Sequence, residues 1–294
     1  MLNQETKVVA IVGPTASGKS RMAMELARRF NGEIIAADSR TIYRGLDIGT
    51  AKPSISDREE VRHHLLDIVN PGEPFTVAQF KRLAELAVMD IGARGYLPIM
   101  VGGSGLYIDS VVYDYQFPGA ADPDARKILD GTPTEELVVR LVNLNPSAEK
   151  TVDLRNRRRV IRAIETAGMD RSKSVRAGSR FLVLGVTMNK EVAQIRIKQR
   201  LELMLREGIL DEVLAIAERY GWDCDALRIT GYSAFKRLAL GLVTSDAAVN
   251  EAVLETMKLY KRQMTWFKRN RDIQWVSSER AALSAVTAFV KANV

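Results

Sequence analysis

A glycine-rich segment near the start of the chain has the residue types and spacing of a phosphate-binding loop. Residues 13–20 fit the G-x-x-x-x-G-K-S pattern, between an apolar run at 8–12 and an amphipathic segment at 21–30. In such a strand–loop–helix setting, backbone N–H groups and the positive end of the helix dipole bind phosphate oxygens. The lysine adds a cation, and Ser20 could hold a magnesium ion. We therefore expect a phosphate cradle made of Gly13, Pro14, Thr15, Ala16, Ser17, Gly18, Lys19 and Ser20.

Two further polar side chains follow predicted buried strands. Asp38 comes directly after the apolar run at 33–37, and Ser104 lies in the glycine-rich turn after the run at 97–101. Ligands of an open α/β sheet bind beyond the carboxyl ends of its strands, so both side chains are expected to face the phosphate cradle. A carboxylate there can accept a proton during a reaction. A turn-capping aspartate is the alternative.

A helix predicted over residues 188–206 carries two arginines, Arg196 and Arg200, one turn apart on a shared face. Following a strand of the same sheet, such a pair could close over bound phosphates as a clamp. From these residues alone, ordinary helix-surface charge is the stronger explanation.

The elements that must position these residues indicate an α/β protein. Strands are predicted at 8–12, 33–37, 97–101, 181–186 and 273–276. From about residue 117 the pattern changes to short helices without strands. We predict a P-loop-type parallel sheet flanked by helices. It forms a catalytic core of residues 1–116 and 179–294, interrupted by a helical insertion domain of residues 117–178.

The bulk composition is that of a globular protein. The 294 residues are 46% hydrophobic, and no apolar run approaches the ~20 residues of a membrane span. Cys224 is the single cysteine, which excludes an internal disulfide and a cysteine zinc cluster. The adjacent His63 and His64 would point in different directions, which disfavours a paired metal site. With no signal-peptide pattern at the polar start of the chain, we expect a cytoplasmic protein without membrane association.

The net charge of +7 is concentrated in two stretches. Five arginines fall within residues 155–162, and residues 258–271 contain six basic residues and no acidic one. Clusters of this kind on an enzyme suggest a polyanionic partner such as a nucleic acid, although solvated helix faces have the same pattern. Trp266 and Phe267, in the second stretch, could stack on bases or belong to the core.

Taken together, these segments resemble the tRNA dimethylallyltransferase family, the bacterial tRNA isopentenyltransferases, along nearly the whole chain. The most specific signals are the Asp-Ile-Gly-Thr-Ala-Lys-Pro run at 47–53 and the Lys-Arg-Gln-x-Thr-Trp run at 261–266. The phosphate loop alone is shared with many enzymes. Further matches lie at 38–39, Tyr43, 63–68, 102–107, 156–163, 208–213 and 231–232.

The resemblance implies a P-loop that binds no nucleotide. It would hold the diphosphate of dimethylallyl diphosphate, with Mg²⁺, while the exocyclic N6 amine of the adenosine 3′-adjacent to the anticodon attacks the allylic carbon. By matching motif, Asp38 would be the base and Arg200 would bind the diphosphate. Ser104 would take the place of the family's usual threonine beside the bridging oxygen. The implied partners are dimethylallyl diphosphate and the tRNA anticodon stem-loop, bound by a monomer whose insertion domain contacts the tRNA.

The family pattern also implies a set of tRNA contacts, and the chain departs from the pattern in a few places. Thr41 replaces a common glutamine, Lys268 replaces a common arginine, and the insertion is shorter than usual. Ser104 lacks the methyl group that fixes a threonine rotamer, so retained chemistry at a lower rate is expected. The implied contacts are Asp38, Ser39, Arg40, Thr41, Ser104, Arg126, Arg158, Arg159, Val160, Ile161, Arg162, Arg228, Ile229, Thr230, Gly231, Tyr232, Ser233, Lys261, Arg262, Gln263, Met264, Thr265, Trp266, Phe267 and Lys268.

Three other hypotheses stay open at this point. A small-molecule kinase would use the same loop for ATP, with Asp38 activating a hydroxyl group. An adenylate isopentenyltransferase would prenylate free AMP, a mononucleotide that needs no long basic surface. A non-catalytic RNA-binding module would leave the convergence of Asp38, Ser104 and the phosphate loop without a purpose.

Overall fold

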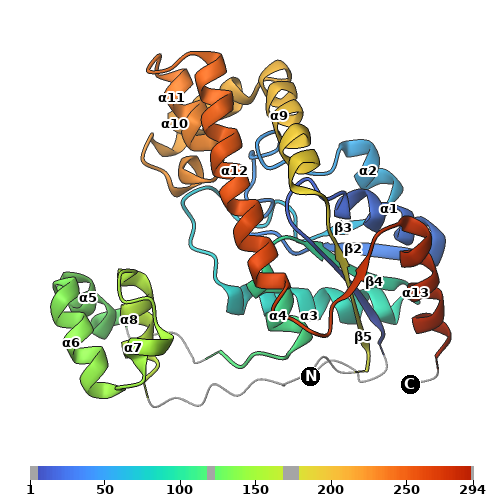
Figure 1. Cartoon of the computed structure of the whole chain (residues 1–294), viewed down its shortest axis with the longest axis horizontal. Helices are drawn as coiled ribbons and strands as arrows, with labels where there is room; N and C mark the ends of the chain where they lie inside the picture. The colour runs from blue at the N-terminus through green and yellow to red at the C-terminus, as the bar shows by residue number, and fades with distance from the viewer. Residues whose placement is uncertain (1–5, 118–122, 168–178, 293–294) are drawn as a thin grey trace. The chain divides into compact units, whose positions relative to one another are not determined.

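The computed structural model describes residues 6–117, 123–167 and 179–292, and its centre is a parallel β-sheet (Figure 1). The strand order is β3-β2-β4-β1-β5-β6, and every pairing is parallel. This confirms the predicted fold class. The strands are β1 (Val8–Val12), β2 (Gly32–Ala36), β3 (His63–His64), β4 (Leu97–Gly102), β5 (Phe181–Val186) and β6 (Gln274–Val276).

The register of the central strands brings three loops to one edge of the sheet. Val12 at the end of β1 pairs with Gly102 at the end of β4. Ala36 at the end of β2 pairs with Val101 of β4. The segments that follow these strands therefore begin side by side. The sequence-predicted phosphate loop, the Asp38 turn and the Ser104 turn are those segments.

Helices cover both faces of the sheet, as right-handed crossovers between parallel strands require. α1 (Lys19–Phe30) and α13 (Glu279–Lys291) pack on one face, in a core with Val9 and Ile11 of β1. α3 (Val77–Ala93) and α4 (Gly105–Val112) lie on the opposite side, and Phe80 of α3 stacks on Tyr107 of α4 at a centroid distance of 4.1 Å. Within the described ranges, no helix has the length and apolar composition that spanning a membrane requires.

A second group of helices has its own hydrophobic core beyond the carboxyl edge of the sheet. Its fully buried side chains include Tyr232 and Phe235, and the long helix of the group runs back toward α4 (Figure 1). The helices are α9 (Lys190–Glu207), α10 (Ile209–Tyr220), α11 (Tyr232–Ala239) and α12 (Ser245–Phe267).

The chain divides into two compact units, one of residues 1–114 and 175–294 and one of residues 115–174. The smaller unit packs Leu137 of its second helix against Val160 and Ile161 of its last. Its helices are α5 (Pro123–Gly131), α6 (Thr134–Leu144), α7 (Ala148–Thr151) and α8 (Arg157–Glu165). Part of the expected insertion, residues 118–122 and 168–178, lies outside the described residues.

The strand β3 and the helices α2 (Ile55–Glu60) and α4 of the core are absent from the sequence-based prediction. The strand β3 has two residues, too few to show a periodic pattern, and His64 Nε2 lies 2.6 Å from a Glu33 oxygen beside it. α2 has no buried residue and is held by a capping box at Ser54. α4 begins at Gly105, inside the glycine-rich turn that was predicted after the run at 97–101.

Candidate functional site

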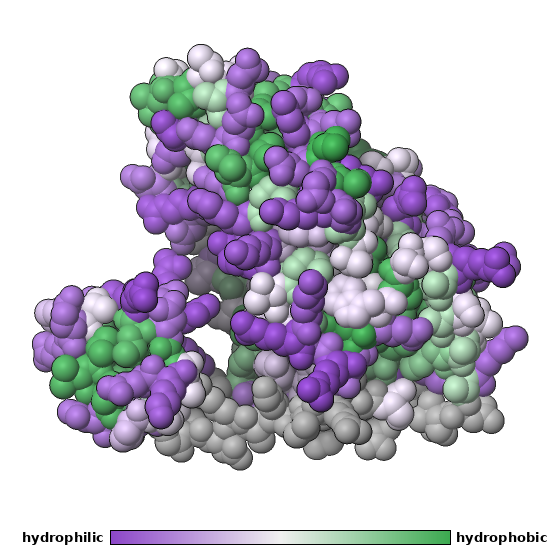
Figure 2. Space-filling model, viewed as in Figure 1, coloured by the Kyte–Doolittle hydropathy of each residue, from purple (hydrophilic) through white to green (hydrophobic). Residues whose placement is uncertain are grey.

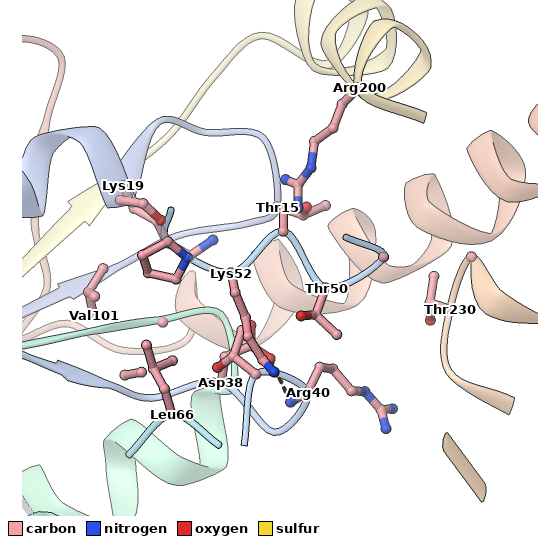
Figure 3. A pocket seen from close by; sticks show the side chains of 18 of the residues that line it. Thr15, Lys19, Asp38, Arg40, Thr50, Lys52, Leu66, Val101, Arg200 and Thr230 are labelled. Carbon is pink, nitrogen blue, oxygen red and sulfur yellow. Dashed lines mark hydrogen bonds between the residues drawn. The ribbon is translucent and has the colours of Figure 1, made fainter. Parts of the chain in front are cut away.

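A cavity of about 500 Å³ lies at the carboxyl edge of the sheet, where the three loops meet (Figure 3). Its wall includes Lys19 and Ser20 of the phosphate loop, Asp38 after β2, and Arg200 from α9. Of the two arginines considered for a clamp, Arg200 lines the cavity whereas Arg196 is exposed on the helix surface. Segments far apart in the sequence therefore share one site.

The backbone of the phosphate loop has the shape that an anion site needs. A Cβ on Gly13 would lie 2.3 Å from the Val186 carbonyl oxygen, so only glycine fits there. Gly18 has φ +90° and precedes α1, whose first turn has no side-chain cap. The uncapped N–H groups of that turn are donors for an anion. Among the described residues, the buried Ser17 hydroxyl of this loop has no hydrogen-bond partner.

Lys19 is held inside this loop rather than in solvent. Its Nζ donates to the Pro14 carbonyl at 3.2 Å. Burial lowers the pKa of Lys19 from 10.5 to about 8, and the neighbouring Asp38 carboxylate opposes this shift while Arg200 adds to it. These couplings mean that Lys19, Asp38 and Arg200 act on one another electrostatically before any ligand binds.

The lowered pKa of Lys19 predicts a pH-dependent phosphate site. A protonated lysine favours anion binding, and above about pH 8 the free protein increasingly carries neutral Lys19. We expect the affinity for inorganic diphosphate to fall by up to about tenfold per pH unit above about pH 8, and to change little through this group below it. Calorimetric titration across this range measures the effect.

Lys19→Arg is the control for that titration, because a guanidinium stays charged throughout and the diphosphate titrates identically in both experiments. Parallel pH profiles for the two proteins would contradict the assignment of the effect to Lys19.

Asp38 and Arg200 approach the cavity from opposite walls (Figure 3). One Asp38 carboxylate oxygen accepts the Arg40 backbone N–H at 2.9 Å, which fixes the turn after β2. Arg200 extends from α9 toward the phosphate loop. Burial lowers the pKa of Arg200, and the Asp38 carboxylate partly opposes this shift. A guanidinium stays protonated in proteins, so Arg200 is a cation of this wall. The arrangement can hold an anion on one side and receive a proton on the other.

Ser104 lies beside the site but is not among the residues that line the cavity. Its Oγ accepts the Ser39 backbone N–H at 3.0 Å and donates to the Ser39 hydroxyl at 3.3 Å. The expectation that this hydroxyl would point into the crevice is therefore not met in the structure. The observed bonds connect Ser104 to the Asp38 turn instead.

Sequence reasoning missed an anchor of the 47–53 run. The Glu212 carboxylate of α10 accepts the backbone N–H groups of Asp47, Ile48 and Gly49 at 2.7, 2.8 and 3.0 Å. The buried Tyr232 hydroxyl also donates to it, and burial together with this carboxylate raises the pKa of Tyr232. Glu212 thereby joins the helical group to a loop of the sheet. The available sequence signal for Glu212 was its position within residues 208–213, which match the family pattern.

Lys52 is a second anchor of the same run, and its side chain is 1% exposed. Its Nζ donates to the Tyr43 carbonyl at 2.5 Å and to the carboxylates of Asp47 and Asp67 at 2.6 and 2.5 Å. A buried ammonium needs such partners. Lys52 therefore stabilises the cavity wall, and no sequence pattern separates this role from ligand binding.

The expected tRNA contacts differ in their exposure in the structure. Arg40 and Thr230 lie on the cavity wall, and hydrophilic residues cover much of the visible face of α12 (Figure 2). The exposed basic positions are Arg40, Arg158, Arg159, Arg228, Lys261, Arg262 and Lys268. The side chains of Val160, Ile161, Ile229, Tyr232 and Phe267 are at most 3% exposed, so only their backbone could contact RNA.

Several of the remaining expected tRNA contacts have protein partners. Arg126 donates to Glu165 at 2.9 Å and also pairs with Asp130, and Arg162 shares the same Glu165. The Trp266 Nε1–H donates to Asp109 at 2.8 Å, and the ring is 37% exposed. The sequence is compatible with two roles for Trp266, a core residue or a ring that stacks on bases. In the structure its ring is packed on one side and open on the other.

The described residues contain no cluster of three or more histidine, cysteine, aspartate or glutamate side chains that could hold a metal ion. Ser20 is exposed at the cavity beside the phosphate loop. One hydroxyl fits Mg²⁺, which keeps several waters and takes its other ligands from bound phosphates.

The chain is similar in sequence to one family of transferases along most of its length. The family model of IPP transferases matches residues 41–270. A tRNA dimethylallyltransferase of Anoxybacillus flavithermus is 41% identical over 278 residues, covering 92% of this chain and 89% of that protein. The tRNA dimethylallyltransferase 1 of Citrifermentans bemidjiense is 40% identical over 283 residues, covering 93% of this chain and 92% of that protein.

Solved structures agree with these matches. The full-length tRNA isopentenylpyrophosphate transferase of Bacillus halodurans is 34% identical with a TM-score of 0.73, covering 97% of this chain and 96% of that one. A eukaryotic dimethylallyltransferase, described as acting on tRNA, has a TM-score of 0.85 and 23% identity, covering 97% of this chain and 80% of that one. At that identity the second likeness shows the fold alone.

Proposed function

Because this chain belongs to the IPP transferase family, we propose that its cavity transfers a dimethylallyl group from dimethylallyl diphosphate to tRNA. The acceptor is the N6 amine of the adenosine 3′-adjacent to the anticodon. The observation that carries the proposal is the meeting of an anion site and a carboxylate in one cavity. Lys19 and Arg200 are positioned for the diphosphate, and Asp38 lies within their electrostatic reach.

The reaction forms a C–N bond and breaks a C–O bond. The N6 amine attacks the allylic carbon, the diphosphate leaves with the bonding electrons, and the amine proton passes to Asp38. Negative charge grows on the leaving diphosphate, so preorganised N–H donors and cations aimed at it lower the barrier most. Lys19, Arg200 and the uncapped turn of α1 supply them. Asp38 acts as a general base on an amine that becomes acidic during the attack.

The cavity also has an apolar part that suits a short branched alkyl chain. Leu201 and Met204 continue the wall beyond Arg200 on α9, and Phe235 faces the cavity from α11. Apolar walls exclude water, which would otherwise compete with the amine for the allylic carbon. We propose that these residues surround the prenyl group.

Magnesium is the proposed cofactor. Ser20, at the start of α1, would hold the ion together with oxygens of the bound diphosphate, and the ion would neutralise charge on the leaving group. We further propose that the protein works as a monomer, since residues of one chain supply the phosphate loop, the base and the clamp.

The proposed function is tested with three parallel incubations of the purified protein and Mg²⁺. Dimethylallyl diphosphate is supplied with unmodified tRNA or with AMP, and ATP is supplied with tRNA. We expect prenylated adenosine, identified by mass, in the first incubation alone. Product from AMP but not from tRNA would identify an adenylate isopentenyltransferase. Formation of ADP would identify a kinase.

Binding of tRNA is expected to weaken steeply with salt. Exposed basic side chains such as Arg159, Lys261 and Arg262 would neutralise phosphates, and each neutralised phosphate releases a counterion. Between about 50 and about 200 mM salt, we expect affinity to fall by at least about tenfold in a filter-binding assay. An affinity independent of salt would show that these residues make no phosphate contacts.

A further inference from the structure

One side chain of α12 joins two loops that border the cavity. Gln263 Oε1 accepts the Thr15 backbone N–H at 2.9 Å, and Gln263 Nε2 donates to the Gly103 carbonyl at 3.0 Å. The approach is close, because a Cβ on Gly103 would lie 2.3 Å from Nε2. Gln263 also lines the cavity itself. The family resemblance suggests an RNA contact here, but the side chain reaches the phosphate loop.

The connection continues through the next residue. Ser104, directly after Gly103, accepts the Ser39 N–H at 3.0 Å, and Ser39 follows Asp38. Hydrogen bonds of two side chains therefore link the loops after β1, β4 and β2 in a row. The phosphate loop lies at one end of this row and the Asp38 turn lies at the other.

We propose that Gln263 is a positioning residue for prenyl transfer. It fixes the phosphate loop against the Gly103–Ser104 turn and thereby sets the place of the leaving diphosphate relative to Asp38. This inference rests on the proposed function and deepens it. Reactions between bound groups depend strongly on such placement, and a shift of about 1 Å can cost about 10²-fold in rate.

The chemistry of the two contacts explains why the residue is a glutamine. The Thr15 N–H requires an acceptor and the Gly103 carbonyl requires a donor, and one neutral amide supplies both. Leucine has nearly the same shape but supplies neither bond. Asparagine keeps the amide but is one methylene shorter, so it cannot reach both partners from the same backbone position. These differences define the variants that test the proposal.

The test uses the full chain with Gln263→Leu and Gln263→Asn, and with Gln194→Glu, an exposed position on α9, as the control. Three quantities are measured: the affinity for inorganic diphosphate with Mg²⁺, the kcat and KM for dimethylallyl diphosphate at saturating tRNA, and the affinity for tRNA. We expect both Gln263 variants to lose roughly tenfold in diphosphate affinity and at least about tenfold in kcat/KM. Affinity for tRNA should stay within about twofold, and the control should match the unmodified protein.

Unchanged diphosphate affinity and kinetics in Gln263→Leu would overturn the proposal. Loss of tRNA affinity alone would show that Gln263 contacts RNA instead. If neither variant folds, hydrogen exchange of the Thr15 amide in the unmodified protein tests the proposal. The bond to Gln263 should protect this amide even without ligand. Fast exchange would refute the bond. If the unmodified protein transfers no prenyl group, the proposed function fails while the diphosphate measurement still tests Gln263.

Discussion

Replacing Asp38 with asparagine is expected to lower kcat for prenyl transfer to tRNA by at least about 10²-fold. The variant removes the carboxylate that receives the amine proton. The amide oxygen can still accept the Arg40 N–H that Asp38 binds at 2.9 Å, so the turn after β2 is preserved. Steady-state kinetics with saturating tRNA and donor measure the change, and filter binding should show tRNA affinity within about threefold of normal.

Asp223→Asn is the matched control for this variant, because the same chemical change is made at a side chain that is 94% exposed. It should leave kcat unchanged. A comparable loss of tRNA affinity in Asp38→Asn would show that Asp38 positions the RNA. Full activity of Asp38→Asn would remove its role as base.

The second large effect is expected at Arg200. Replacing it with alanine should raise the KM for dimethylallyl diphosphate by about tenfold to 10²-fold, since hydrogen bonds to charged groups are worth about 1.5–3 kcal/mol. Lysine at this position keeps the charge but loses the bidentate geometry, so an intermediate KM is expected. The affinity for tRNA, which does not depend on this cation, should be retained.

Arg196→Ala is the control for the clamp, because Arg196 lies one turn earlier on the same helix and is exposed. Its removal should change neither kinetic constant by more than about twofold. Equal effects of the two substitutions would mean that α9 attracts the donor through general positive charge. An unaltered KM in Arg200→Ala would exclude a clamp.

The sequence predicts the fold where hydrophobic patterns are long or clearly bounded by turn residues. The run at 8–12 is buried throughout as β1, and the helix predicted at 188–206 is α9, which differs from the prediction by at most two residues at either end. Parallel order follows from strands that alternate with helices. The short elements β3 and α2 escape prediction, since two residues and six exposed or half-buried residues carry no usable periodicity.

Site residues that directly follow a predicted strand or loop motif can be located from the sequence. Site residues that are placed by tertiary contacts cannot. Lys19 and Asp38 follow strands β1 and β2, so their convergence is a consequence of sheet topology. Glu212 binds backbone groups more than 160 residues away, and Gln263 reaches Thr15 across 248 residues. No local pattern encodes such partners. The prediction that the Ser104 hydroxyl points into the crevice is not met for the same reason. The direction of this hydroxyl depends on its hydrogen bond with the backbone of Ser39.

The phosphate loop is proposed to hold a leaving diphosphate rather than a phosphoryl group to be transferred. The most direct test of this role follows dimethylallyl diphosphate, labelled in its terminal phosphate, during a reaction with unmodified tRNA. One labelled inorganic diphosphate, released intact for each prenyl group found on the tRNA, is the expected result. Label transferred to the RNA, or released as single phosphate in step with product formation, would contradict it.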